Sequence, residues 1–119
     1  SNVKVYDDFA HHPTAIKMST ESIREKHPNK KILGIVELGS NTMSSGYHND
    51  NLIESFKALD ETLLLDRNAA YNYSNGFNSE KEIIECIKTK LIKYDIILIM
   101  TNKDSQKFIK PIIENLENK

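Results

Sequence analysis

The sequence predicts an α/β fold, a three-layer sandwich in which a mostly parallel sheet is covered by helices on both faces. Short apolar runs rich in branched residues alternate with longer segments of helical periodicity, in the order β-α-β-α-β-α-β-α. Continuous apolar runs are typical of strands buried on both faces. This alternation predicts right-handed crossovers between parallel strands. The length, 119 residues, is that of a single domain.

Four apolar runs are the expected strands: Val3 to Tyr6, Ile32 to Leu38, Thr62 to Leu65 and Ile96 to Met100. The second and fourth runs, ILGIVEL and IILIM, contain almost no polar residue. Arg67 to Asn78 is rich in Asn, Tyr and Gly, which predicts a loop with room for one short edge strand.

Four segments have helical periodicity: Pro13 to Lys26, Asp50 to Leu59, Ser79 to Ile92 and Asp104 to Glu117. Pro13 suits a first helical turn, where its missing N–H is no loss. Ser79 and Glu82 have the spacing of a capping box, which predicts a helix start. Pro111 lies within the last pattern and predicts a kink or a new turn there.

The charge of the chain is balanced, with 16 basic and 17 acidic residues and a net charge of −1. This gives no electrostatic reason to expect nucleic acid or an anionic membrane as a partner. The longest apolar run is far shorter than the ~20 residues of a membrane span, and no signal-peptide pattern opens the chain. A single cysteine, Cys86, excludes an intramolecular disulfide and a multi-cysteine zinc site. We therefore expect a cytoplasmic location.

Ligands of open α/β sheets bind beyond the carboxyl ends of the strands. The segment with the most chemistry at such an end is Asp7 to Pro13, which reads DDFAHHP. Its carboxylates leave a strand, and its imidazoles precede a helix whose N-terminus attracts phosphates or carboxylates. An aspartate there can accept from sugar hydroxyls, and a histidine can donate to an anion. The alternative is that the aspartates are solvated and that His12 caps the helix. Zinc is disfavoured, because neighbouring residues rarely point at one ion.

A second candidate segment follows the second strand, where Ser40, Asn41 and Thr42 could hydrogen-bond a polar ligand or form a plain polar turn. Gly34 and Gly39 have the spacing of the two glycines of a P-loop. No lysine follows them, so a P-loop is rejected. Thr101 to Ser105, after the last strand, indicates a helix cap more than a phosphate site.

The first motif, Asp8-Phe9-Ala10-His11-His12-Pro13, resembles the D-[YF]-A-H-x-P signature that opens the C-terminal domain of the Mur ligases. These are ATP-dependent enzymes that build the peptide of peptidoglycan precursors. The second motif, Gly39-Ser40-Asn41-Thr42-Met43, is similar to the R-S-N-T-M segment of the murein-recycling branch. That branch joins UDP-N-acetylmuramate to L-alanyl-γ-D-glutamyl-meso-diaminopimelate. The branch that adds L-alanine to UDP-N-acetylmuramate fits less well.

The resemblance implies that residues 1–119 are the third, Rossmann-like domain of a three-domain enzyme. The N-terminal domain, absent from this chain, would bind the UDP-sugar. The central domain, also absent, would carry the P-loop, Mg²⁺ and most of the ATP site. ATP would phosphorylate the muramoyl carboxylate, and the α-amine of the peptide would attack the acyl phosphate. The isolated domain would be inactive.

The resemblance also implies roles for residues, none of them as a metal ligand. Asp8 would approach the ATP ribose, and His11 would act in catalysis, facing the peptide or the reacting phosphate. His12 would support the turn and contribute to substrate binding. The residues expected to line the peptide pocket are Ser40, Asn41 and Thr42.

Two departures from the family pattern concern the peptide site. Gly39 stands where the family has an arginine, which would be a natural bidentate clamp for a carboxylate. Thr101 to Gln106 stands where the family has a glycine-rich segment.

Two other classes of protein remain open at this point. One is a phosphoacceptor receiver domain, with Mg²⁺ held by Asp7 and Asp8, phosphorylation at Asp66, and Thr101 or Lys103 completing the site. It leaves both motifs unexplained. The other is a non-catalytic nucleotide-binding module.

Overall fold

The computed structural model describes residues 3–10, 12–38, 49–71 and 73–117. In these ranges the strands form one sheet in the order β1-β5-β2-β3-β4, and every pairing is parallel. The strands are β1 (Lys4–Asp8), β2 (Ile32–Glu37), β3 (Glu61–Leu65), β4 (Gly76–Phe77) and β5 (Ile96–Met100). The predicted α/β class is confirmed, and β4 is the short edge strand for which the loop had room.

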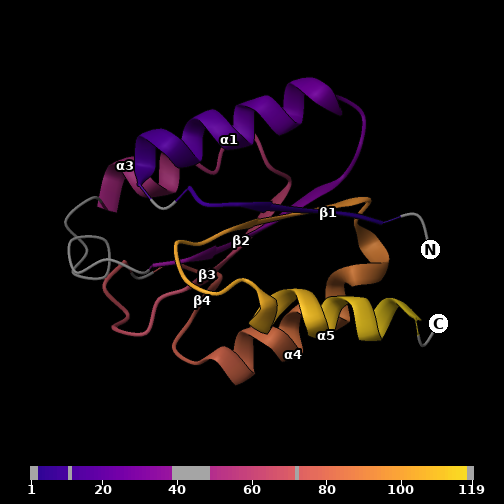
Figure 1. The fold of residues 1–119 in the computed structure, drawn as a ribbon. Coiled ribbons are helices and arrows are strands. Elements are labelled where there is room, and N and C mark those ends of the chain that lie inside the picture. The colour runs from indigo at the N-terminus through magenta and orange to yellow at the C-terminus, as the bar shows by residue number, and fades with distance from the viewer. Residues whose placement is uncertain (1–2, 11, 39–48, 72, 118–119) are drawn as a thin grey trace.

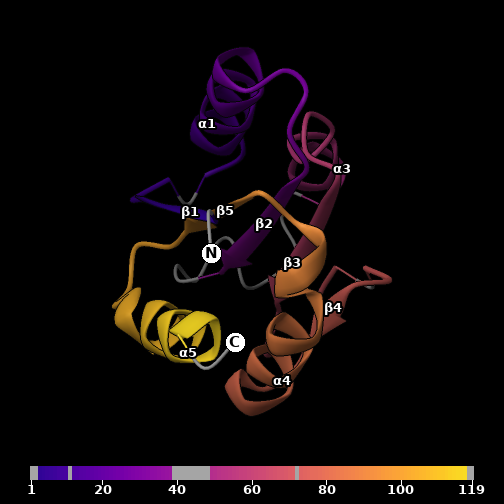
Figure 2. The same cartoon turned by 90° about the vertical axis from the view of Figure 1, so that its right-hand side faces the viewer.

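Helices cover both faces of this sheet. They are α1 (Pro13–Lys26), α3 (Asn49–Glu54), α4 (Glu80–Lys90) and α5 (Gln106–Glu117), with a 3₁₀ turn at Leu91–Lys93. Figure 1 shows α1 and α3 above the sheet and α4 and α5 below it, and Figure 2 shows the same layers in a view turned by 90°. The result is the expected three-layer sandwich.

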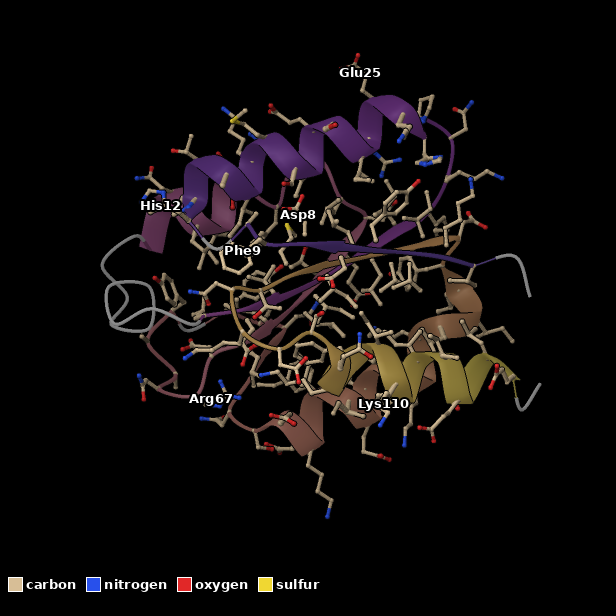
Figure 3. All side chains as sticks on the ribbon, in the orientation of Figure 1. Asp8, Phe9, His12, Glu25, Arg67 and Lys110 are labelled. Atoms are coloured by element: carbon tan, nitrogen blue, oxygen red, sulfur yellow. The ribbon has the colours of Figure 1, made fainter. Side chains whose placement is uncertain are left out.

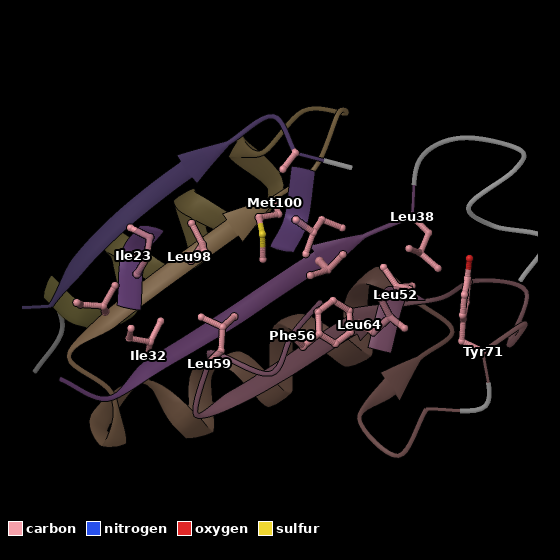
Figure 4. Packing of buried hydrophobic residues seen from close by; sticks show 14 residues of the cluster. Ile23, Ile32, Leu38, Leu52, Phe56, Leu59, Leu64, Tyr71, Leu98 and Met100 are labelled. Carbon is pink, nitrogen blue, oxygen red and sulfur yellow. The ribbon is translucent and has the colours of Figure 1, made fainter. Parts of the chain in front are cut away.

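The core lies in two apolar layers, one on each face of the sheet. Every residue of β2 is buried, and side chains alternate between the faces along a strand. Ile32 and Val36 therefore join the layer under α1 and α3, drawn in Figure 4. Leu33 and Ile35 join the layer against α4 and α5. Burial on both faces explains why this strand has no polar alternation in the sequence.

The helix predicted over 50–59 ends early, at Glu54. The α-helical pattern is lost at Phe56, whose N–H bonds to the Ile53 carbonyl at 3.2 Å, three residues back instead of four. The Ser55 carbonyl, which a helix to Leu59 would use, accepts from the Thr20 hydroxyl of α1 at 2.9 Å. The Leu59 N–H bonds to Phe56 instead, at 3.0 Å. Phe56 and Leu59 still reach the core, so the apolar pattern survives although the helix does not.

Of the three predictions about helix starts and a new turn at Pro111, one is confirmed and two differ from the structure. The Ser79 hydroxyl accepts the Glu82 N–H at 3.2 Å, which confirms the cap of α4. The last helix begins at Gln106, not Asp104, because the Asp104 carboxylate accepts the Gln106 N–H at 3.0 Å and so precedes the helix. Pro111 lies inside α5, which continues to Glu117, so no new turn starts there.

Candidate functional site

The carboxyl ends of four strands meet at one edge of the sheet. In the pairing register, Asp8 at the end of β1 lies beside Met100 of β5, and Met100 lies beside Val36 of β2. Glu37, the last residue of β2, pairs with Leu65 of β3. The residues that end or directly follow these strands therefore form a row along this edge, to which we refer below as the carboxyl edge.

Asp8 shapes the turn between β1 and α1. One carboxylate oxygen, Oδ1, accepts the Ala10 N–H at 3.0 Å, and the other, Oδ2, accepts the Ser19 hydroxyl of α1 at 2.7 Å. Each carboxylate oxygen has two lone pairs, so both can accept a further hydrogen bond. Phe9, which lies between Asp8 and Ala10 in the chain, is 70% exposed. The turn is thus fixed by Asp8 while Asp8 keeps capacity for a ligand.

His12 is the N-cap residue of α1. Its backbone is extended, its carbonyl accepts the Ile16 N–H at 2.8 Å, and Pro13 occupies the first turn as predicted. His12 thus occupies the cap position, as the structural alternative expected, but its imidazole makes no capping hydrogen bond. The side chain lies on the exterior at the positive end of the helix, in the position labelled in Figure 3.

Glu37 is a buried carboxylate at the centre of the carboxyl edge, 1% exposed. Its Oε1 accepts the Thr101 hydroxyl at 2.6 Å. Its Oε2 accepts from the Lys107 ammonium at 2.7 Å and from the Arg67 guanidinium at 3.0 Å. Burial alone would raise the pKa of this carboxyl, but the hydrogen bonds from Lys107, Thr101 and Arg67 outweigh burial and lower the pKa. Glu37 is therefore an anion at neutral pH.

A continuous series of hydrogen bonds crosses the carboxyl edge. The Thr101 N–H donates to the carbonyl of Asp8 at 3.2 Å, and the Thr101 hydroxyl donates to Glu37. Glu37 in turn holds Arg67, which follows β3. Figure 3 shows His12 and Arg67 at the same end of the molecule, on opposite faces of the sheet. Hydrogen bonds thus link the end of β1 to the residue after β5, to the end of β2 and to Arg67 after β3.

A groove of about 430 Å³ lies between α1 and α3, next to His12. Its walls carry both signs of charge, with Lys17 and Lys57 opposed by Glu21 and Glu54. Its volume is within the range of small-ligand sites, but the mixed charges select no single ligand class.

The sequence profile of the family described as "Mur ligase, glutamate ligase domain" matches residues 1–104. The chain belongs to the Mur ligase family. It is 44% identical over 66 residues, 55% of its length, to the UDP-N-acetylmuramate–L-alanyl-γ-D-glutamyl-meso-2,6-diaminoheptandioate ligase of Escherichia coli, of which it covers 14%. It is 30% identical over 97% of its length to a UDP-N-acetylmuramate–L-alanine ligase of Caldanaerobacter subterraneus, of which it covers 24%.

Among solved structures, this Mur ligase domain resembles the murein peptide ligase of Psychrobacter arcticus. The TM-score is 0.76 at 30% sequence identity, over 100% of this chain and 29% of that one. The chain thus spans less than a third of the length of these relatives. The expected fold and family are confirmed.

The structure brings two of the predicted site residues of this Mur ligase domain together. Asp8 and His12 lie at the two ends of the same turn, at the carboxyl edge. The other predicted site residues lie outside the described residues: His11, Ser40, Asn41 and Thr42, and with them Gly39. Their roles stay predictions.

Asp66, the phosphorylation site of the receiver alternative, has a structural role. It is 3% exposed, and its two carboxylate oxygens accept the N–H groups of Ala70 at 3.1 Å and Tyr71 at 2.9 Å. Thr101 is also buried and donates to Glu37. Both side chains are engaged in internal hydrogen bonds, which argues against phosphorylation of Asp66.

Three charged residues of the site were not predicted: Glu37, Arg67 and Lys107. The signal for Glu37 was present, because a carboxylate in the apolar run ILGIVEL needs a partner when the run is buried. Nothing in the sequence identifies those partners, which lie 30 and 70 residues further along the chain.

Two features are absent from the part of the chain that the structure describes. It holds no group of three or more His, Cys, Asp or Glu side chains arranged to bind a metal ion. None of its helices has the length and apolar character needed to span a membrane.

Proposed function

We propose that this chain is the substrate-closing domain of an ATP-dependent ligase that joins L-alanyl-γ-D-glutamyl-meso-diaminopimelate to UDP-N-acetylmuramate. The observation that carries the proposal is the pairing of the Asp8–Pro13 turn with the carboxyl edge, in a chain similar to ligases named for that reaction. Such an enzyme forms a C–N bond in peptidoglycan recycling, and we place it in the cytoplasm.

ATP, with Mg²⁺, would supply the phosphoryl group that activates the muramoyl carboxylate; the α-amine of the peptide then forms the amide, releasing phosphate and a proton. Asp8 fits a ribose, because its carboxylate keeps acceptor capacity after holding the turn. Mg²⁺ would be held mainly by the other domains of the enzyme.

The remaining roles are assigned from the family motif. His11 would face the peptide or the reacting phosphate as the catalytic residue, and His12, at the positive end of α1, would attract an anionic group of the substrate. The peptide pocket would be lined by Ser40, Asn41 and Thr42.

An exposed apolar surface supports the idea that further domains cover this one. Phe9 is 70% and Met18 is 67% exposed, and both line a hollow of about 400 Å³ that also contacts Asp8. Exposed apolar side chains that cluster beside a polar site are typical of a surface that a partner covers. In the proposed enzyme that partner is the central, ATP-binding domain of the same chain.

The test is an assay of the full-length enzyme with ATP, UDP-N-acetylmuramate and either the tripeptide or free L-alanine. We expect ADP release that depends on the tripeptide. The similarity to an L-alanine ligase over 97% of the chain makes L-alanine the second candidate, and preference for it would replace our assignment. His11→Ala should strongly reduce turnover without unfolding the domain. Near-normal turnover in this variant would show that His11 is not a catalytic residue.

A further inference from the structure

The charges around Glu37 are unequal. One buried carboxylate receives two cations, Lys107 and Arg67, besides the Thr101 hydroxyl. The Lys107 side chain is 19% exposed and points its ammonium at Glu37. The Arg67 side chain is 45% exposed. Both cations contact Glu37, and Arg67 is the more exposed of the two.

The guanidinium of Arg67 has one short contact and one long contact. Nη1 donates to Glu37 at 3.0 Å, and Nη2 lies 3.4 Å from Glu80, which is itself 45% exposed. A long, exposed pair of this kind contributes little. A guanidinium has five N–H donors in a planar fork. Within the described residues Arg67 therefore keeps donors beyond those two contacts, on a fork that Glu37 holds in place.

Arg67 lies at the carboxyl edge, where open α/β sheets bind their ligands. It follows β3 at the carboxyl edge, two residues beyond Leu65, which pairs with Glu37. Figure 3 shows it at the same end of the molecule as His12. In the sequence, Glu37 is separated by one residue from Gly39, where the family resemblance leads us to expect an arginine. The carboxyl edge therefore has a guanidinium of its own, on the residue two positions after β3.

We propose that Arg67 binds a carboxylate of the peptide substrate and provides the guanidinium that position 39 lacks. The inference rests on the proposed function. A held, planar fork matches a carboxylate with two parallel N–H···O bonds. Glu37 is a positioning residue, because its hydrogen bond to Nη1 orients the guanidinium of Arg67. Glu80 is an exposed competitor, which a carboxylate of the substrate displaces.

The test uses the full-length ligase with tripeptides that are each amidated at one carboxylate. For Arg67→Ala we expect the KM of the unmodified tripeptide to rise on the order of ten- to a hundredfold, with the KM values of ATP and UDP-N-acetylmuramate unchanged. In the wild type, one amidated tripeptide should show the same rise. Combining that peptide with Arg67→Ala should produce no further rise, since the two changes remove one contact.

Control variants separate this role from a structural one. Lys110→Ala removes an exposed cation of α5, away from the carboxyl edge in Figure 3, and should leave the tripeptide KM unchanged. Glu80→Gln removes the competitor and should not raise it. Arg67→Lys keeps a charge beside Glu37 and should fold normally while recovering only part of the affinity.

Two results would overturn the inference. One is that every amidation affects wild type and Arg67→Ala by the same factor. The other is that Glu80→Gln raises the tripeptide KM as much as Arg67→Ala does, because the surface ion pair would then be what matters. A wild-type enzyme that does not use the tripeptide at all would instead refute the proposed function.

Discussion

The hydroxyl of Ser19 donates to Oδ2 of Asp8 at 2.7 Å and so ties the second turn of α1 to the end of β1. Because Oδ1 of the same carboxylate accepts the Ala10 N–H, Asp8 holds both the turn and the helix that follows it. The first residue of the family motif is therefore a structural residue as well as a candidate ligand residue. Its two roles can be separated through Ser19.

Ser19→Ala should lower the free energy of unfolding of the domain by about 1 kcal/mol, the usual net contribution of one hydrogen bond. Ser22→Ala is the matched control, because Ser22 is exposed on the same helix and gains the same helix propensity. Urea denaturation of the three proteins measures the difference. Equal stabilities for the two variants would show that the hydrogen bond from Ser19 to Asp8 does not contribute to the free energy of unfolding.

Arg24 joins three segments of the chain. Its Nε donates to the Ala58 carbonyl at 2.9 Å, its Nη1 to the Lys30 carbonyl at 2.8 Å, and its Nη2 to Asp60 at 2.7 Å. Arg24→Met should destabilise the domain by about 1–3 kcal/mol, since several charge-assisted bonds are lost at a side chain that is only 27% exposed. A thermal melt measures this.

The control for Arg24 is Lys57→Met, which removes a cation from an ion pair whose side chains are 78% and 67% exposed. Exposed pairs contribute little, so we expect less than about 0.5 kcal/mol. If Arg24→Met and Lys57→Met lowered the free energy of unfolding equally, the contacts of Arg24 would contribute no more to stability than those of an exposed ion pair.

Gly34 leaves space on β2 that Leu59 fills. A Cβ on Gly34 would overlap Leu59 Cδ1 and would lie 3.3 Å from Thr62 Oγ1. Gly34→Ala should therefore cost about 1–3 kcal/mol through overpacking. In a Leu59→Val background the cost should shrink, because the shorter side chain vacates that space. Strictly additive costs in denaturation would contradict this packing relationship.

Stability should fall in acid, in part through Glu37. The pKa of its carboxyl lies below the usual 4.5 in the folded state, so its contribution is full above that value and is lost as the pH falls through the folded pKa. The pKa values of Asp60 and Glu61 are lowered too, where burial is outweighed by hydrogen bonds from Ile32 to Asp60 and from Lys90 to Glu61.

Glu37→Gln should therefore destabilise the domain at pH 7 and flatten the loss of stability as the pH falls below 4.5, as followed by urea denaturation at a series of acidic pH values. Glu114→Gln, at an exposed position on α5, should leave the pH profile as it is. A profile for Glu37→Gln that is parallel to wild type would mean that Glu37 does not contribute to acid unfolding.

The sequence predicted those parts of the fold that depend on local patterns. The apolar runs ILGIVEL and IILIM became buried strands, and the Ser79 cap formed because it needs only its own helix. The predicted end of the helix at Leu59 was wrong because the chain tightens at Phe56, whose N–H bonds to Ile53. Contacts from elsewhere in the fold, such as that of the Thr20 hydroxyl with the Ser55 carbonyl, leave no signal in the local pattern.

In the candidate site, too, the sequence predicted what a local motif encodes and missed contacts between distant residues. Asp8 and His12 stand in one short motif, and the end of a strand places them at the carboxyl edge. The partners of Glu37 come from other strands and helices, and their contacts depend on the strand order, which local periodicity does not encode.

The strand order has a consequence for how the domain assembles. Among the described strands, β1 pairs only with β5, although almost the whole chain separates them in sequence. Long-range parallel pairing of this kind is slow, because the intervening loop must close first. During synthesis the Asp8 turn emerges before β5 and lacks its neighbour in the sheet until Ile96–Met100 has emerged. An incomplete chain that lacks β5 therefore does not present a finished site.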